Sequence, residues 1–427
     1  GQAYAFSVFN LPMTRLIGIT QPAAADWKLT ELGWIFSLAI FFLGVSAALL
    51  GRWVEEGGPR RAMFTAALCW AGGFFLAAIG VHLHNLWFIY FGYGVLGGFG
   101  LGIGYISPVS TLIRWFPDRP GMATGMAIMG FGGGAFIAAP LSVWLMNRFS
   151  TPSHVGVAEA FAVMGLIYLC FMMVGAAIVR VPPPDWAPSG YQVPTATKRL
   201  MTTRNVFVYD ALKTPQFWLV WWVLCLNVTA GIGVLGQASA MSQEMFRGRI
   251  TAVAASGLVG LFSLFNMGGR FVWSSVSDYI GRKNTYYVFF VLGAILYLLV
   301  PGTGAAGSVA AFVLCYALIF SMYGGGFATV PAYLRDLFGT RYVGAIHGML
   351  LTAWSMAGIF GPVLVNYIRE YNVTHGVAAA QAYNTTMYVM AALLVVGFIC
   401  NLLIRPVSER FHMAMAEPRA SAVGGES

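Results

Sequence analysis

The stretch SSVSDYIGRK, residues 274–283, ends a long apolar segment with an acid, a glycine and two bases. GRWVEEGGPRR, residues 51–61, ends an earlier apolar segment in a similar way, with Glu55 in the place of Asp278. We call the separation between Glu55 and Asp278 the repeat spacing. The same spacing, or one position less, relates four further pairs: Pro108 and Pro331, Gly125 and Gly348, Arg119 and Arg341, and Pro140 and Pro362. One nearly constant spacing over five pairs indicates that the chain contains two copies of one folding unit.

The composition places that folding unit in a membrane. Hydrophobic residues make up 58% of the 427 residues and charged residues only 9%, whereas soluble domains are about a quarter charged. Stretches without Lys, Arg, Asp or Glu cover residues 62–113, 120–147, 160–179, 214–243, 250–269, 284–334, 342–368 and 371–404. Because a spanning helix needs about 20 apolar residues, the two longest stretches each predict two helices.

Two further segments complete the expected set of spanning helices. Residues 32–51 form another apolar span, and residues 1–17 form a shorter one. We interpret the short segment as the outer part of a first helix whose start is missing. The sequence therefore predicts an all-α membrane protein with twelve transmembrane helices, arranged as two pseudo-symmetric lobes of six.

The basic residues are distributed unequally between alternate loops. Seventeen of the 24 Lys and Arg residues fall in one set of loops and in the tail, and only six fall in the other set. The positive-inside rule places the richer set in the cytoplasm, with both termini, and predicts a multi-pass protein of a bacterial inner (plasma) membrane. The net charge of +9 follows from this arrangement and does not indicate nucleic-acid binding.

A polar segment rich in proline and basic residues divides the chain. We expect an N-terminal lobe at 1–180, a cytoplasmic linker at 181–214, a C-terminal lobe at 215–405 and a cytoplasmic tail at 406–427. The linker is expected to be a solvated loop without a further role. The five cysteines are scattered through apolar spans without CxxC spacing, which supports neither disulfides nor a metal site.

The repeated motif resembles the signature G-x-x-x-D-R-x-G-R-R of the major facilitator superfamily, which follows the second and eighth helices of those transporters. The second copy fits from Asp278 onward, whereas the first has Glu55 in place of the aspartate. Charge-assisted bonds at such helix ends can join neighbouring helices and hold one conformer. The residues expected to carry this conformational motif are Gly51, Glu55, Gly58, Arg60, Asp278, Gly281 and Arg282.

Four strings make the chain similar to the oxalate:formate antiporter family and its monocarboxylate-porter relatives. These strings are YAFSVF at 4–9, RWFPDR at 114–119 followed by Gly121, TPQFW at 214–218, and LFN at 264–266 followed by Arg270. The resemblance covers essentially the whole chain. It implies a twelve-helix transporter of small carboxylates.

Arg270 is the one cation inside a predicted span. Eight residues at about 1.5 Å each place it about 12 Å from the helix end at Asp278, near the middle of a core about 30 Å thick. An ionisable group at that depth is costly and marks a functional site, and a guanidinium fork matches a carboxylate. The alternative is that Arg270 bonds to backbone carbonyls or to an acid, but the sequence has no Asp or Glu at comparable depth.

Helix positions suggest which other side chains share this layer. Asn266 is one turn from Arg270 on the same face, and Tyr105, Tyr323 and Trp354 lie about 13 to 20 Å from the basic side. Helix packing is the alternative role for each of them. The complete candidate set for substrate binding is Arg270, Tyr105, Asn266, Tyr323, Trp354, Phe327 and Tyr4.

The resemblance also shows two departures that affect the choice of substrate. Oxalate-carrying members have a second cation, a lysine, in their eleventh helix, and Trp354 stands at the matching position. A dianion held by one arginine would keep an uncompensated charge, so a small monocarboxylate anion is the better match. Monocarboxylate porters carry an aspartate at the position of Asn266, so the group that would carry a coupling proton is left open.

We therefore predict a secondary transporter of lactate-, pyruvate- or acetate-like monocarboxylates, working as a monomeric unit in the lipid bilayer, with proton symport expected. An oxalate:formate-type anion exchanger and a transporter-like sensor are the alternatives. A membrane-embedded enzyme would need a nucleophile, a metal cluster or an acid/base pair at membrane depth, and the sequence shows none of these. We therefore expect a transporter and not an enzyme, and we expect no cofactor. His82, His84 and His347 are expected to have surface or packing roles.

Overall fold

The computed structural model describes residues 2–183, 186–190, 200–202, 204–235 and 237–413, so parts of the predicted linker and tail lie outside the described residues. The N-terminal helices are α1 (Gln2–Ala5), α2 (Ser7–Met13), α3 (Leu29–Gly57), α4 (Pro59–His82), α5 (Leu86–Ile89), the π-helix η1 (Tyr90–Gly97), α6 (Gly98–Trp115), α7 (Pro120–Phe149) and α8 (Val157–Ile178). The C-terminal helices are α9 (Val208–Ala211), α10 (Pro215–Leu235), α11 (Ala238–Met245), α12 (Ala252–Ile280), α13 (Arg282–Ala305), α14 (Val309–Phe338), α15 (Val343–Leu350), α16 (Thr352–Thr374), η2 (Ala379–Gln381), α17 (Asn384–Leu403) and η3 (Glu409–Phe411).

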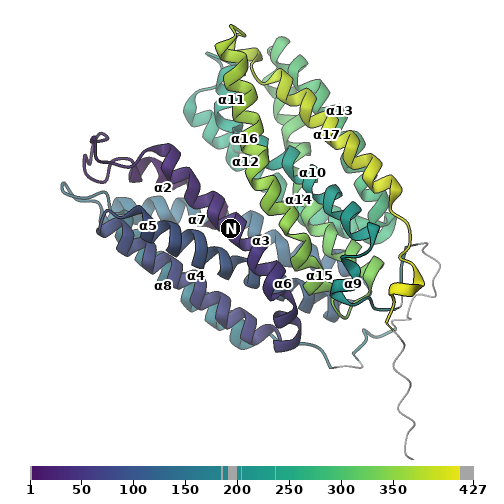
Figure 1. The fold of residues 1–427 in the computed structure, drawn as a ribbon. Helices are drawn as coiled ribbons and strands as arrows, with labels where there is room; N and C mark the ends of the chain where they lie inside the picture. The colour runs from purple at the N-terminus through teal and green to yellow at the C-terminus, as the bar shows by residue number, and fades with distance from the viewer. Residues whose placement is uncertain (1, 184–185, 191–199, 203, 236, 414–427) are drawn as a thin grey trace, which may run out of the picture.

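The helices form two groups that follow chain order (Figure 1). Helices α1 to α8 make the N-terminal lobe, and α10 to α17 make the C-terminal lobe. Ten segments among the described residues are long and apolar enough to cross a membrane. Helix α12, with 29 residues, is also long enough for a core of about 30 Å, and α1 with α2 supplies the short opening segment. The all-α, two-lobed architecture predicted from the repeat is confirmed.

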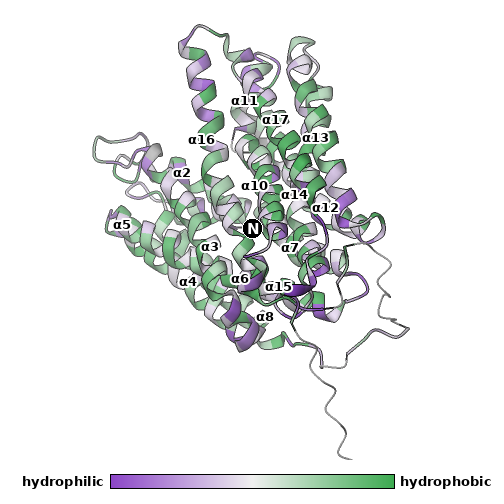
Figure 2. Ribbon diagram, turned by 45° about the vertical axis from the view of Figure 1, so that its right-hand side comes forward, coloured by the Kyte–Doolittle hydropathy of each residue, from purple (hydrophilic) through white to green (hydrophobic). Residues whose placement is uncertain are grey.

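The described chain segments between the lobes lie at one end of the molecule, where several helix ends are hydrophilic (Figure 2). We call this end the linker side, because α3 and α12 end there and the described linker residues 200–202 and 204–207 pack there. We call the opposite end the far side. The lobes meet near the linker side, where α7 packs against α12, and α3 packs against α15 and α16. Toward the far side, α2 and α5 diverge from α11 and α13 (Figure 1).

Two glycines of the repeated motif make equivalent turns. Gly58 separates α3 from α4 with φ +82°, and Gly281 separates α12 from α13 with φ +88°. A β-carbon at either position would meet no neighbouring atom, so backbone conformation explains the glycines there, because only glycine adopts positive φ without strain. The two positions are related by the repeat spacing, so the sequence repeat and the structure agree here.

The described part of the linker is not a free loop. Thr202 N–H donates to the Asp336 carbonyl at 2.9 Å, and Val206 N–H donates to the Phe338 carbonyl at 2.9 Å. The tail joins the same surface, because Met413 N–H donates to the Asn205 carbonyl at 2.8 Å. The expectation of a solvated linker therefore fails for these residues, which cover the linker-side end of α14.

Candidate functional site

Arg270 lies in the middle of α12 with its side chain completely buried. Its Nε donates to Asn266 Oδ1 at 3.1 Å, and one terminal nitrogen donates to the Ile128 carbonyl of α7 at 3.4 Å. The other terminal nitrogen, Nη2, has no hydrogen-bond partner among the described residues. The guanidinium therefore bridges the two lobes and keeps donor capacity unused.

Close helix packing fixes the position of this arginine. A β-carbon on Gly269 would overlap the backbone of Ser321 in α14, and one on Gly324 would overlap the backbone of Asn266. Glycine at both positions lets α12 and α14 touch backbone to backbone, as small residues do in membrane helix pairs. On the other side, a β-carbon on Gly132 of α7 would lie 3.1 Å from Arg270 Nε, so α7 also leaves room for the side chain.

Aromatic rings surround the guanidinium. The Arg270 Cζ atom lies 5.3 Å from the centre of the Phe327 ring and 5.8 Å from that of Phe131, within cation–π range. Trp354 contacts both phenylalanines, with ring centres 4.5 Å from Phe327 and 5.3 Å from Phe131. Phe131 belongs to α7, Phe327 to α14 and Trp354 to α16, so three helices from both lobes form one apolar wall.

The tyrosines complete this wall. The Tyr105 ring is 5.6 Å from that of Trp354, and its hydroxyl lies close enough to Arg270 to interact with the guanidinium, although no hydrogen bond of good geometry joins them. Tyr4 from α1 and Tyr323 from α14 meet across the lobes, with their hydroxyl oxygens 3.3 Å apart. The structure thus brings all seven predicted residues into one cluster, in which Tyr4 is half-buried and the other six are buried.

The unsatisfied atoms of this cluster share one chemical property. Arg270 Nη2, Trp354 Nε1 and the Tyr105 hydroxyl have no hydrogen-bond partners among the described residues, and each can donate a hydrogen bond. Leaving a buried donor unpaired costs about 1–3 kcal/mol, and more when the donor is charged. A small anion would satisfy these donors together and would neutralise the arginine.

The cluster has three further contributors that were not predicted from the sequence. They are Phe131, the Ile128 carbonyl and His347, whose ring centre lies 5.8 Å from that of Tyr105. His347 is 1% exposed, which rules out the surface role considered for it. The repeat offers a signal for Phe131, because the repeat spacing relates it to Trp354 and it occupies the equivalent place in the other lobe.

A separate cavity lies within the N-terminal lobe. It has a volume of about 250 Å³ and is lined by α4, α6, α7 and α8 of the N-terminal lobe and by Gln2. Tyr105, Ile128 and Phe131 border it, but Arg270 does not. The cation and the unpaired donors therefore place the candidate binding site between the lobes and not in this cavity.

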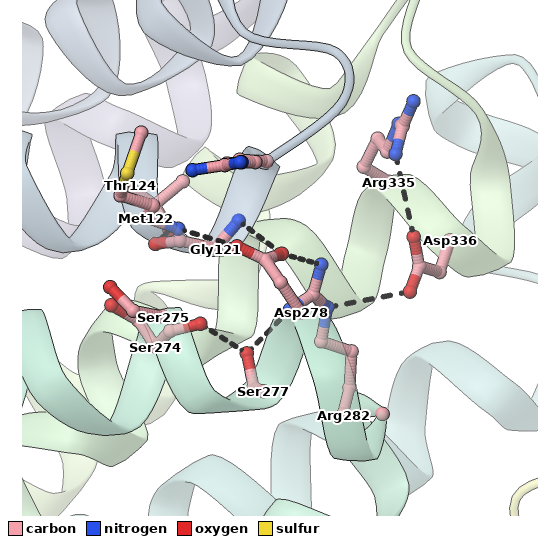
Figure 3. A network of polar contacts seen from close by, with 12 residues as sticks. Gly121, Met122, Thr124, Ser274, Ser275, Ser277, Asp278, Arg282, Arg335 and Asp336 are labelled. Atoms are coloured by element: carbon pink, nitrogen blue, oxygen red, sulfur yellow. Dashed lines mark hydrogen bonds and ion pairs between the residues drawn. The ribbon is translucent and has the colours of Figure 1, made fainter. Parts of the chain in front are cut away.

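The two acids of the conformational motif, Asp278 and Glu55, join the lobes on the linker side, and Figure 3 shows the network around Asp278. The Asp278 carboxylate accepts 2.9 Å hydrogen bonds from the N–H groups of Gly121 and Met122, at the first turn of α7. In the equivalent place, Glu55 accepts a 2.8 Å bond from Gly344 N–H at the first turn of α15. The repeat spacing also relates Gly121 to Gly344, so each lobe caps a helix of the other lobe by the same contact. Negative charge at a helix N-terminus is stabilising.

The basic partners of these acids differ between the copies. Arg282 donates to Asp278 at 2.5 Å and lies 3.4 Å from Asp336, which confirms the predicted bond between α12 and α13. Glu55 pairs with Arg114 of α6 instead of a base on α4. Arg60 donates to the Ala177 carbonyl of α8 at 2.7 Å, so the predicted bond between α3 and α4 does not form.

Further bonds reinforce the closure on the linker side. Arg335 at the end of α14 donates to the Pro117 carbonyl of the N-terminal lobe at 3.1 Å. Thr124 of α7 donates to the Ala328 carbonyl of α14 at 2.6 Å, and this contact is completely buried. Together with the two helix caps, these bonds hold the lobes together on the linker side, so the described conformation is closed there.

Comparison of the solved structures with this chain shows the same fold. The fucose:proton symporter FucP of E. coli superposes with a TM-score of 0.65 at 13% identity, with 94% of each chain covered. The proton:xylose symporter XylE gives a TM-score of 0.68 at 14% identity, with 93% of this chain and 90% of that chain covered.

Sequence comparison is more specific. The oxalate:formate antiporter of Oxalobacter formigenes is 31% identical over 363 residues, which cover 84% of this chain and 79% of that protein. Monocarboxylate transporter 11 of Homo sapiens is 26% identical over 387 residues, covering 86% and 76%. The family model for the Major Facilitator Superfamily matches residues 3–362. The chain therefore belongs to the Major Facilitator Superfamily, in the group that includes the oxalate:formate antiporter and monocarboxylate transporters.

Proposed function

We propose that this transporter moves small monocarboxylates of the lactate, pyruvate or acetate type by alternating access, coupled to protons. The observation that carries the proposal is the unpaired Arg270 Nη2 inside a buried ring of aromatic side chains. The arginine would hold the carboxylate, and Tyr105 and Trp354 would donate to its oxygens. Phe131 and Phe327 would cover a short carbon chain.

Charge balance favours a monoanion over a dianion. Within the described cluster, Arg270 is the only permanently charged side chain, and Trp354 occupies the position where the family resemblance implies a lysine in oxalate carriers. One cation neutralises one carboxylate, whereas a second carboxylate would remain uncompensated in a low-dielectric site. Exchange of oxalate for formate is the second candidate, favoured by the 31% identity to the oxalate:formate antiporter.

The orientation, lobe boundaries and assembly belong to the same proposal. We place the linker side in the cytoplasm of a bacterial cell, because the loops on that side carry most of the basic residues. Lobes at 1–180 and 215–405 would rock about the central site, with 181–214 as linker and 406–427 as tail. One chain would form the transport unit.

Uptake of a labelled acid panel into proteoliposomes tests the proposal. Lactate, pyruvate, acetate, formate and oxalate would be offered with and without an inward proton gradient, and with and without anion inside. We expect uptake of the monocarboxylates and acceleration by the gradient. Flux of oxalate and formate that strictly requires an internal anion would favour the exchanger, and binding without any flux would favour a sensor.

Trp354→Lys is expected to shift preference toward small dicarboxylates. The lysine would add a second cation beside Arg270, and the gain in dicarboxylate binding should be a few-fold, corresponding to about 1 kcal/mol. Two like charges in an empty buried site should also lower the melting temperature without ligand. Ligand-induced thermal shift with lactate and oxalate measures both effects.

Trp354→Gln is the matched control for this substitution, because it changes volume without adding charge. An equal gain in oxalate binding in the glutamine variant would mean that pocket volume decides selectivity. Unchanged dicarboxylate binding by a folded Trp354→Lys variant would contradict the electrostatic explanation.

A further inference from the structure

His347 is a buried titratable side chain to which the proposed binding mode gives no role. It lies on α15, is 1% exposed, and has no hydrogen-bond partner for Nδ1 among the described residues. About two helical turns separate it from Trp354, so the two side chains lie on the same side of the helical segment. Its ring contacts Tyr105 of the other lobe, with 5.8 Å between ring centres. His347 therefore borders the candidate site on its linker side.

The internal repeat indicates that His347 occupies a contact position between the lobes. The repeat spacing relates Thr124 to His347, and it also relates Tyr105 to Ala328. The contact between His347 and Tyr105 is thus the counterpart of the bond from Thr124 to Ala328, which joins α7 to α14. Both contacts cross between the lobes where the linker side is closed. When the lobes separate on that side, His347 becomes accessible to water.

The charged groups near His347 come from several helices. Toward the linker side, Glu55 of α3 binds Gly344 N–H, three residues before His347, and is paired with Arg114 of α6. Toward the candidate site, Arg270 of α12 lies beyond Tyr105. Glu55 is already neutralised by Arg114, so Arg270 supplies the uncompensated charge on this side of the imidazole.

The other helices packed against α15 add no unpaired charge at this depth among the described residues. Arg335 and Asp336 of α14 lie at its linker-side end and pair with each other. Asp210 of α9 pairs with Lys213. Helix α10 contains no charged residue, and those of α16, Arg369 and Glu370, lie near its far-side end.

We propose that His347 is the proton-binding residue of this transporter, with Nδ1 accepting the coupling proton. This inference rests on the proposed monocarboxylate transport and names the group that couples it to protons. An imidazole is the side chain whose charge changes most readily near neutral pH. Among the described residues, no Asp or Glu lies in the cluster around Arg270 to take this role.

The proposed coupling follows from electrostatics. Burial of the imidazole opposes a positive charge on His347, and with the site empty the Arg270 cation beyond Tyr105 adds a second opposition. A bound carboxylate neutralises Arg270 and removes that opposition, so anion binding favours protonation of His347. By linkage, protonation favours anion binding by the same factor. The proton would leave Nδ1 for water when the linker side opens, and release of the anion would follow.

Two transport assays with His347→Gln test this role. Glutamine keeps polarity and approximate size but cannot titrate. In proteoliposomes, the wild type should take up lactate faster under an inward proton gradient by about tenfold, a typical coupling factor. His347→Gln should lose this acceleration and retain lactate counterflow. His82→Gln, which changes an exposed histidine at the end of α4, should behave like the wild type.

A binding assay in detergent gives an independent readout. The affinity of the wild type for lactate should fall by about tenfold as pH rises through the titration of His347, because the protonated form favours the anion. In His347→Gln and His347→Asn the affinity should not depend on pH over this range. Normal gradient-driven uptake or normal pH dependence in either variant would overturn the proposal.

The remaining outcomes separate this inference from the proposed function. Loss of both counterflow and binding in both variants would assign His347 a packing role and would also overturn the proposal. Wild-type counterflow of lactate without any effect of the proton gradient would leave monocarboxylate transport standing and reject proton binding at His347. Absence of lactate binding and counterflow in the wild type would reject the monocarboxylate function itself.

Discussion

Arg270→Ala is expected to abolish monocarboxylate transport while the protein still inserts and folds. The variant loses the only permanent cation of the described cluster, and with it two or more hydrogen bonds to the carboxylate. Hydrogen bonds to charged groups contribute about 1.5–3 kcal/mol each, so affinity should fall by about 100-fold or more. Arg270→Lys keeps the charge but loses the planar fork, and an intermediate loss of about tenfold is expected. Equilibrium binding of labelled lactate and counterflow measure both losses.

The control for this prediction is Arg247→Ala, which removes an exposed arginine from the far side. It should leave binding and counterflow unchanged. Near-normal transport by Arg270→Ala, in a preparation with a wild-type melting curve, would show that the carboxylate binds elsewhere. Loss of folded protein in Arg270→Ala but not in Arg270→Lys would indicate that Arg270 mainly bridges the lobes through Asn266 and the Ile128 carbonyl.

The sequence predicts the fold well because the length of each uncharged segment and the spacing between repeated residues can both be read along the chain. Segments without charge must lie in the membrane, and the repeat spacing predicts the pseudo-symmetric lobes. The same spacing does not reveal that Asp278 and Glu55 cap helices of the opposite lobe. Those contacts depend on the relative position of the lobes, which helix periodicity within one lobe does not determine.

The candidate site was predictable to a similar extent and for a similar reason. Depth along each helix identifies Arg270, Tyr105, Tyr323 and Trp354, because a rise of about 1.5 Å per residue converts sequence separation into depth. Depth does not reveal which face of a helix points to the centre. An apolar ring such as Phe131 and a histidine near a helix start such as His347 have many packing roles. The repeat spacing to Trp354 is a signal for Phe131, whereas His347 is distinguished by its contact with Tyr105.

Helix α12 connects the candidate binding site to the Asp278 contacts that close the linker side. This helix carries Arg270 near its middle and Asp278 near its end, and its linker-side half packs against α7. The first turn of α7 binds the Asp278 carboxylate, and the Ile128 carbonyl farther along α7 accepts a bond from Arg270. Separation of the lobes on the linker side must therefore break contacts of the motif acid and of the candidate substrate-binding residue together.

Asp278→Asn is consequently expected to slow transport by about tenfold without weakening intrinsic substrate binding. The amide oxygen can still accept from one of the N–H groups of Gly121 and Met122, so one charge-assisted bond between the lobes is lost, at a cost of about 1.5–3 kcal/mol. The equilibrium should move toward the state open on the linker side by about 10- to 100-fold. A cysteine at Ala328, buried at the contact between the lobes, should be alkylated faster from the linker side in a background lacking the native cysteines.

Substitution of Glu55, the equivalent acid in the other lobe, provides the comparison for this prediction. Glu55→Gln removes the equivalent cap on α15 and should shift the same equilibrium in the same direction, whereas Asp118→Asn removes an exposed acid that pairs with Arg119 and should have no effect. Because the two caps lie on different helix pairs, their effects on the equilibrium should be nearly additive in free energy. A large loss of lactate affinity in Asp278→Asn, with unchanged turnover and unchanged labelling at Ala328→Cys, would mean that the motif acid acts on the binding site and not on lobe closure.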